Sequence, residues 1–240
     1  MRLVWVELCK LLRLPSARAG VALGVLCAPA IAAVSAPSER SAAVDVAFLE
    51  LTFGVIGAIL LGVVAVSSEY RDDGEDSAST RQIVASLTAV PSRMRFLAAK
   101  AAALSLTVAT TAMLATVIML TMLAGTGEDL GPGVVGRGVG LIVYWVLTAL
   151  IAFGITLLTR NGVVPLVVLL LNSSVISFTY LLSRVVPAAN YFPDLAGPHM
   201  FLRRSPTGVE IGPVTGGLVM LGWTVVLLAV GAFRFQRSDA

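Results

Sequence analysis

Six long stretches of this chain carry no charged residue, and their lengths constrain the fold more than any other feature. They have 18 to 27 residues each and lie at 19–38, 51–68, 101–127, 138–159, 161–183 and 211–233. A helix needs about 20 apolar residues to cross the ~30 Å hydrocarbon core of a bilayer. Each stretch therefore fits one crossing. Because lipid offers the backbone no hydrogen-bond partners, we expect each crossing to be a helix.

The composition supports the same class of protein. Charged residues make up 13% of the chain and apolar residues 57%, and the mean hydropathy is +0.91. An average soluble domain has about 25% charged residues, so this chain has too few to cover a soluble surface. Disorder is excluded as well, because it requires low hydrophobicity and high charge. The sequence predicts an all-α polytopic membrane protein.

We predict a single transmembrane domain over residues 1–240. An amphipathic helix in the membrane interface (1–18) precedes six spans, and a cytoplasmic loop (69–97) follows the second span. A long extracellular segment (185–210), parts of which re-enter the interface, precedes the last span. The six predicted spans are 19–38, 46–68, 98–124, 136–159, 161–184 and 211–233. The alternative for the first helix is a simple polar lead-in to the first span.

Lysine and arginine in the flanks of the spans predict the orientation. Twelve lie on the side of the termini and five on the opposite side. Cytoplasmic flanks carry the excess of these residues, so both termini are expected in the cytoplasm. The net charge of +3 follows from these flanks and requires no nucleic acid partner. A cleaved signal peptide ending near Ala36 is disfavoured, because the 19 residues before its apolar core exceed a usual n-region.

A few polar residues inside the spans are candidates for a translocation path. Glu50 lies near the start of the second span and fits either an anchor at the interface or a buried site. The fifth span has a polar stripe at helical spacing, which fits either hydrogen bonds between helices or the lining of a path. The stripe residues are Asn172, Ser173, Ser177 and Tyr180. In the fourth span, Gly136 and Gly140 form a small-xxx-small step that permits close helix approach.

Several kinds of chemistry lack their motifs in this chain. There is no GxxxxGK[ST] phosphate loop, no HExxH and no CxxC, so neither a nucleotide-hydrolysing site nor a zinc site is predicted. The single histidine, His199, is interpreted as a surface residue of the 185–210 segment. Cys9 and Cys27 are placed in the cytoplasm and within a span, which argues against a disulfide. We therefore expect no catalytic residue, no metal ligand and no cofactor bound by the chain itself.

The loop after the second span holds most of the cytoplasmic charge. An acidic turn precedes a short predicted helix, on which Ile83, Val84 and Leu87 form an apolar stripe before Pro91 ends it. A helix of two to three turns is not stable by propensity alone. It needs a surface on which to bury its stripe, either the lipid bilayer or a groove in a soluble partner.

The string SSEYR…RQIVASLTAVPSRMRFLAAK in this loop resembles the permease subunits of ATP-binding-cassette (ABC) exporters of the type 2 permease class. In that family a Glu-Tyr/Phe-Arg turn after the second span precedes a helix, an L-x-x-x-P-x-R motif and an alanine-rich, Lys-bearing entry to the third span. The matching residues are Glu69, Tyr70, Arg71, Arg81, Leu87, Pro91, Arg93 and Lys100. The tract YFPDLAG and the tail AFRFQRSDA also resemble actinobacterial members. The insert DDGEDSAS departs from the family pattern.

The resemblance implies a type V exporter-like fold in the bacterial plasma membrane. It implies a dimer with a second permease, identical or paralogous, that docks on a pair of separate ATPase subunits holding ATP and Mg²⁺. Exported substrates would be amphiphilic small molecules, such as an antibiotic, lipids or peptides. The coupling contact would use Glu69, Tyr70, Arg71, Arg81, Ile83, Val84, Leu87, Pro91 and Arg93. The alternatives are an ATP-independent channel or facilitator, and a membrane enzyme that depends on His199.

Overall fold

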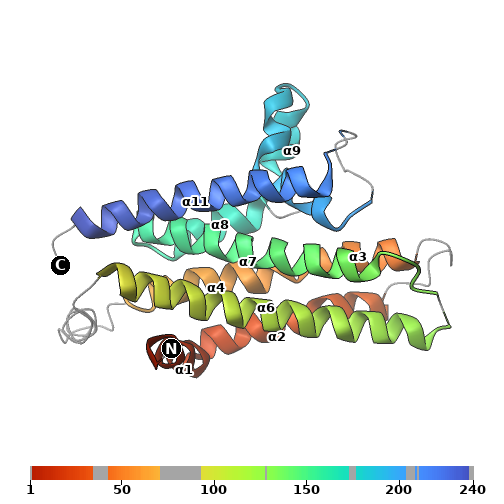
Figure 1. Ribbon diagram of the computed structural model, residues 1–240, viewed down its shortest axis with the longest axis horizontal. Helices are drawn as coiled ribbons and strands as arrows, with labels where there is room; N and C mark the ends of the chain where they lie inside the picture. Colours follow the sequence, from red (N-terminus) through yellow and green to blue (C-terminus); the bar gives the residue numbers. More distant parts are fainter. Residues whose placement is uncertain are drawn as a thin grey trace.

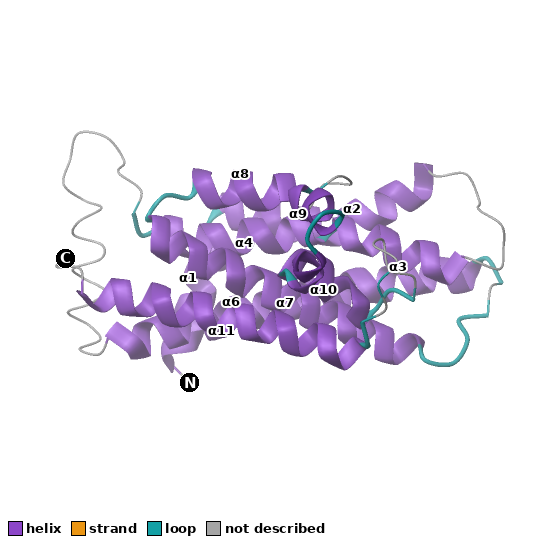
Figure 2. Cartoon of the chain, turned by 90° about the horizontal axis from the view of Figure 1, so that it is seen from above, coloured by secondary structure: helices purple, strands orange, loops and turns teal. Residues whose placement is uncertain are grey.

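The computed structural model describes residues 2–34, 43–70, 93–127, 129–172, 177–203, 209 and 211–237. Long helices lie side by side along one axis in Figure 1 and again in the perpendicular view of Figure 2, so the molecule is an elongated bundle. The first half contains α1 (Arg2–Arg13), α2 (Pro15–Val34), α3 (Ala43–Phe53), α4 (Val55–Ser67) and α6 (Arg93–Gly125). The second half contains α7 (Val134–Thr159), α8 (Val163–Asn172), α9 (Phe178–Ser183), η2 (Pro187–Tyr191), α10 (Pro193–Ala196), η3 (Gly197–Met200) and α11 (Pro213–Arg237).

Five helical segments among the described residues are long and apolar enough to cross a membrane. They are α2, α3 with α4 as one segment of 25 residues, α6 from Met94, α7 and α11. This agrees with the first, second, third, fourth and sixth predicted spans. The chain is thus a multi-pass helical membrane protein, as its composition predicted.

The fifth predicted span differs from a single helix. α8 has 10 residues, which is about 15 Å of helix, and α9 begins at Phe178 and projects out of the bundle in Figure 1. The backbone of Ser177 is extended (φ −72°, ψ 147°), and its side chain accepts a hydrogen bond from the Tyr180 amide as an N-cap. The prediction that Ser177 continues one helical stripe from Asn172 is therefore wrong. A serine that caps a new helix turns the chain at this point.

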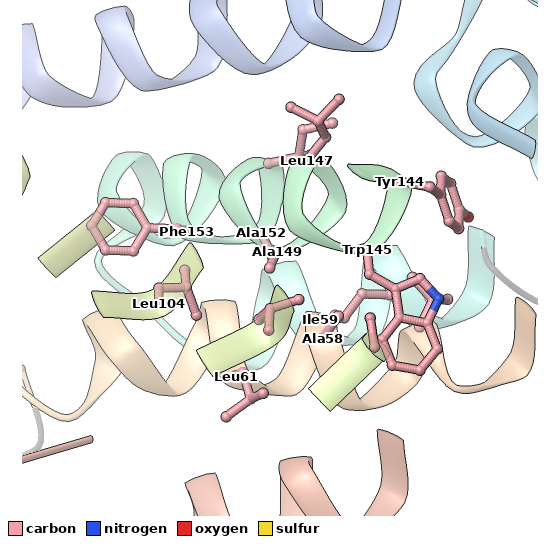
Figure 3. Close-up of a cluster of buried hydrophobic side chains, with 14 of the residues drawn as sticks. Ala58, Ile59, Leu61, Leu104, Tyr144, Trp145, Leu147, Ala149, Ala152 and Phe153 are labelled. Atoms are coloured by element: carbon pink, nitrogen blue, oxygen red, sulfur yellow. The ribbon is translucent and has the colours of Figure 1, made fainter. Parts of the chain in front are cut away.

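α7 occupies the centre of the bundle, where it packs against α4, α6, α8 and α11. In Figure 3, Trp145 and Phe153 of α7 lie toward α4 and α6, near Ile59 and Leu104, whereas Leu147 points to the opposite side. Both aromatic side chains are fully buried. Two thirds of the α7 span is buried, against 22% of the α11 span. α7 is therefore an interior helix, and most of α11 faces outward.

Glycine allows α2 and α4 to touch through their backbones. A Cβ atom on Gly57 would lie 2.3 Å from the Gly20 carbonyl oxygen, so only glycine fits there. The step predicted in the fourth span behaves differently: a Cβ on Gly136 would meet nothing within 4 Å, whereas one on Gly140 would meet the Met200 carbonyl at 2.3 Å. Gly140 thus receives the η3 segment and not another span.

α1 lies across the bundle and is seen end-on in Figure 1. It packs mainly on α6 and α2 and buries Glu7 and Leu11, while Trp5 and Leu12 point outward. An exposed tryptophan on a helix that crosses the bundle axis is typical of a helix in the membrane interface. The amphipathic character was predicted correctly, but the buried face contains a carboxylate.

Candidate functional site

A cavity of about 810 Å³ opens at the end of the bundle where α1 lies, which we call the α1 end. α1 and the start of α2 line the cavity on one side. The C-terminal half of α4, the first turns of α6, the α7–α8 turn and α8 form the rest of its wall. Its wall is part ionic and part aliphatic. Binding pockets for drug-sized ligands fall in the same range of volumes, roughly 300–1,000 Å³.

The ionic part of the wall centres on Lys100. Its Nζ atom lies 2.6 Å from Glu69 Oε1 and 3.4 Å from Glu7 Oε2, and Glu7 Oε1 lies 3.2 Å from Lys10 Nζ. We call these four residues the Lys100 cluster. Glu7 and Lys100 are 6% and 7% exposed. Charges buried to this extent are stable only when paired, so the cluster holds its members together.

The Lys100 cluster joins the two sides of the loop between α4 and α6. Glu69 stands just before that loop, and Lys100 lies in the second turn of α6 beyond it. Glu7 adds α1 to the same contact. The segments that leave and re-enter the bundle around residues 71–92 are thereby tied to each other and to α1. A displacement of the loop ends would reach the cavity wall directly.

Tyr70 and Arg160 extend this ionic wall. Burial raises the pKa of the Tyr70 hydroxyl, the Arg160 guanidinium opposes that rise, and the Glu69 carboxylate adds to it. Tyr70 follows the end of α4 and lies outside the span. Together these effects place Tyr70, Glu69 and Arg160 in one electrostatic environment at the mouth of the cavity.

Arg160 has an unusual backbone conformation. It caps the C-terminus of α7 in the left-handed region (φ 52°, ψ 18°), and its amide donates to the Thr156 carbonyl. Among the described residues other than glycine, it is the only one with a positive φ. This cap position usually holds glycine, because a Cβ atom is strained there. Next to it, Asn161 Oδ1 accepts from the Val163 amide at 2.8 Å and starts α8.

The predicted coupling residues are only partly described. Glu69 and Tyr70 line the cavity, and Arg93 begins α6. The remaining predicted coupling residues lie outside the described part of the chain: Arg71, Arg81, Ile83, Val84, Leu87 and Pro91. The contact between Glu69 and Lys100 was not anticipated, although both residues belong to the motif that carries the family resemblance.

The predicted path residues do not meet at the cavity. Glu50 is buried in α3, and neither it nor Asn172 is among the described residues that line the cavity. Asn172 Oδ1 accepts from the Thr179 hydroxyl at 2.9 Å, which joins α8 to α9. The Tyr180 hydroxyl accepts from Arg184 at 2.5 Å. Ser173 lies outside the described residues. Asn172 and Thr179 both lie in the fifth predicted span, so this contact joins two parts of that span, and both predicted roles of the stripe stay predictions.

A second ionic contact lies at the opposite end of the bundle. Arg137 Nη1 is 2.8 Å from Asp45 Oδ1, its Nε donates to the Phe201 carbonyl at 2.8 Å, and its guanidinium lies 4.2 Å from the centre of the Phe48 ring. We call this the Arg137 cluster. The sequence placed Arg137 only among the flanking charges. Nothing local in the sequence indicates that α3, α7 and residue 201 meet.

His199 is buried, which corrects its interpretation as a surface residue. It is 8% exposed, with Nδ1 2.9 Å from the Leu195 carbonyl and Nε2 3.1 Å from the Val209 carbonyl. Short helical segments around it pack on α11, where Trp223 donates to the Tyr191 carbonyl and stacks on Phe192. The two hydrogen bonds of His199 therefore join residues 195 and 209 within this segment.

The fold and the cavity define the class: a multi-pass α-helical membrane protein with a large amphipathic cavity at the α1 end. Comparison of the chain with protein family models, with curated proteins and with solved structures gives no match. Among the described residues, no group of histidine, cysteine or acidic side chains is arranged to hold a metal ion.

Proposed function

We propose that this chain is the membrane-spanning permease subunit of an ATP-driven ABC exporter. Two permease subunits, identical or paralogous, form the path, and a separate pair of ATPase subunits binds ATP and Mg²⁺. The proposed site is the bacterial plasma membrane, with the α1 end and both termini in the cytoplasm. Cargo is an amphiphilic small molecule, a lipid or a peptide. The proposal rests on the loop motif that resembles exporter permeases and on the Lys100 cluster.

The Lys100 cluster is the observation that carries the proposal. An ATP-driven transporter without its own phosphate loop must receive its free energy from a partner ATPase through a packed contact. The loop with Ile83, Val84 and Leu87 offers an apolar stripe for such a contact. Lys100 and Glu69 tie both sides of that loop to each other at 2.6 Å, and Glu7 ties them to α1. Movement of a docked ATPase would thus be delivered to the wall of the cavity.

The test is reconstitution with the ATPase that co-purifies with the chain from its native membrane. We expect transport that requires ATP and both subunits. Leu87→Asp should abolish coupled transport, because a charge in a packed anchor position typically costs well over ~1 kcal/mol of binding. Ala85→Asp is the matched control, since residue 85 lies opposite the stripe on a helical wheel.

Two results would contradict the proposal. One is a Leu87→Asp complex that transports at the wild-type rate. The other is transport by the chain alone in liposomes without ATP, which would identify a channel or facilitator instead. Membrane insertion of each variant is checked by extraction and gel filtration, so a loss of transport is not confused with a loss of the protein.

A further inference from the structure

We infer that the cavity at the α1 end binds a single-chain amphiphile with an anionic phosphate or carboxylate head group. The head would lie between Arg13 and Arg160, and the chain would lie along the aliphatic wall formed by α4 and α8. Binding of the amphiphile does not require the exporter function. The interpretation of the bound amphiphile as exported cargo rests on the proposed function.

The charges around the cavity favour a negative head group. Among the described residues, four cations and two carboxylates line it. Lys10 and Lys100 are paired with Glu7 and Glu69, so those charges largely cancel. Arg13 and Arg160 have no carboxylate partner among the described residues. Two positive charges therefore remain across the opening, where an anion gains from both.

One carboxylate oxygen of the Lys100 cluster is buried without a hydrogen-bond partner among the described residues. Glu69 Oε1 contacts Lys100, but the buried Glu69 Oε2 has no hydrogen-bond partner among the described residues. Buried polar atoms are rarely left without a partner. Because this oxygen is closed to solvent, a ligand hydroxyl, as in lysophosphatidate, would donate to it only after a shift of the Glu69 side chain toward the cavity.

The apolar part of the wall fits a hydrocarbon chain. Leu11, Leu14, Leu60, Val63, Val64 and Leu166 line the cavity together with the ionic residues. A fully polar ligand would leave these side chains against water, whereas a fully apolar one would leave the arginines unpaired. Only a molecule with both parts matches the wall. The volume of about 810 Å³ is sufficient for a ligand of that size.

Arg160 supplies the most specific sign of a ligand. Glycine would relieve the backbone strain at this left-handed cap, yet an arginine is present with its side chain at the cavity. Strained residues cluster at functional sites. The first turn of α8 also lines the cavity, and the N-terminal end of a helix favours negative charge.

The experiment uses the purified full chain in a neutral detergent, without any ATPase, and counts bound lipids by native mass spectrometry. The probes are myristoyl-lysophosphatidate and myristoyl-lysophosphatidylcholine, which share the chain and the hydroxyl but differ in head-group charge. Glycerol 3-phosphate provides the head without the chain. We expect one lysophosphatidate per chain at saturation, weaker binding of the choline lipid and no measurable binding of glycerol 3-phosphate.

Variants test the arginines. Arg160→Gln and Arg13→Gln should each weaken lysophosphatidate binding by about fivefold, the upper range for a partly exposed ion pair. Arg234→Gln is the matched control, because this exposed arginine of α11 lies at the same end of the bundle but does not line the cavity. Arg160→Gly should raise the Tm while weakening binding, which separates a lost contact from a damaged fold.

Three outcomes would overturn the inference. They are equal binding of the two lysolipids, unchanged binding in both arginine variants, and binding of glycerol 3-phosphate as tight as that of lysophosphatidate, which would indicate a site for a free phosphate. None of these results bears on ATPase docking. Conversely, a chain that binds the lipid but never couples to an ATPase would overturn the exporter proposal alone.

Discussion

The molecule has a buried ionic cluster at each end of the bundle, and the two clusters are built differently. The Lys100 cluster is a chain of alternating charges on α1, α4 and α6 beside a cavity of about 810 Å³. The Arg137 cluster is a single cation held by a carboxylate, a backbone carbonyl and an aromatic ring. The first borders a cavity, whereas in the second the Arg137 guanidinium is buried and its partner Asp45 is 45% exposed.

The packing around the clusters shows what this difference means. Next to Arg137, one turn along α7, Gly140 leaves room for the Met200 carbonyl and for nothing larger. The segment with residues 187–203 is thereby fixed on α7 and α11. Lys100 and Glu69 instead tie the two sides of a loop together in the wall of the cavity. The Arg137 cluster is thus packed between α3, α7 and the 187–203 segment, whereas the Lys100 cluster borders a cavity.

The largest effect is expected from Lys100→Met. It would leave Glu7 and Glu69 buried, 6% and 13% exposed, without their shared cation. Removing one partner of a buried pair costs about 3–5 kcal/mol, so the Tm should fall by on the order of 10 °C. Thermal unfolding in detergent measures this. Lys10→Met is the control: Lys10 is 45% exposed, and its loss should cost less than about 1 kcal/mol. Equal effects of the two variants would contradict a central role for Lys100.

A smaller loss is expected from Arg137→Met. Its partner Asp45 is 45% exposed and can be hydrated when the arginine is removed, so the cost is mainly that of the charged hydrogen bond to Phe201, about 2 kcal/mol. Thermal unfolding again provides the measurement. Asp45→Asn retains the contacts with Phe201 and Phe48 and should cost under about 1 kcal/mol. A loss from Arg137→Met larger than that from Lys100→Met would reverse the comparison.

Both clusters show how far the sequence alone could lead. Apolar length and the absence of charge predicted six spans, and five of them correspond to long apolar helical segments among the described residues. These five could be predicted because the thickness of a bilayer imposes a length that is visible locally. The amphipathic pattern of α1 was visible for the same reason. Lys100, Glu7 and Glu69 were each recognisable as charges near interfaces, but their contact joins residues up to 93 positions apart. Periodicity along one helix carries no information on which helix lies beside it.

The remaining differences have the same origin. A stripe at helical spacing assumes an uninterrupted helix, and Ser177 interrupts it by capping a new one. His199 was assigned to the surface because its neighbours are loop-forming, but two carbonyl groups enclose it. Gly57 meets Gly20 and Gly140 meets Met200, although only the step at 136 and 140 was predicted to permit close helix approach. Each outcome depends on tertiary contacts.

A pH test concerns Asp194, in the segment near the Arg137 end. Burial raises the pKa of its carboxyl group, and the side chains of Thr179, Ser177 and Asn172 oppose the rise. A carboxyl with a higher pKa in the folded state favours folding when protonated, so its contribution is lost as the pH rises through that pKa. Asp194→Asn should raise stability at pH 7 by about 1 kcal/mol and leave it unchanged at low pH. The Tm of both proteins between pH 4 and 8 tests this, and a gain that is independent of pH would refute it.

The smallest effect, with the opposite sign to those of Lys100 and Arg137, is expected from Arg160→Gly. Arginine in the left-handed region is strained, whereas glycine adopts φ 52° freely but loses more entropy on folding. The net gain should be about 0.5 kcal/mol, or a rise of one to two degrees in Tm. Arg160→Ala separates the two contributions, since it removes the guanidinium but retains the Cβ strain and should give no gain. If Arg160→Gly instead lowered the Tm, the guanidinium would hold the α7–α8 turn in place. Arg160 would then have a structural role, like Arg137, and its charge would not be available to a ligand.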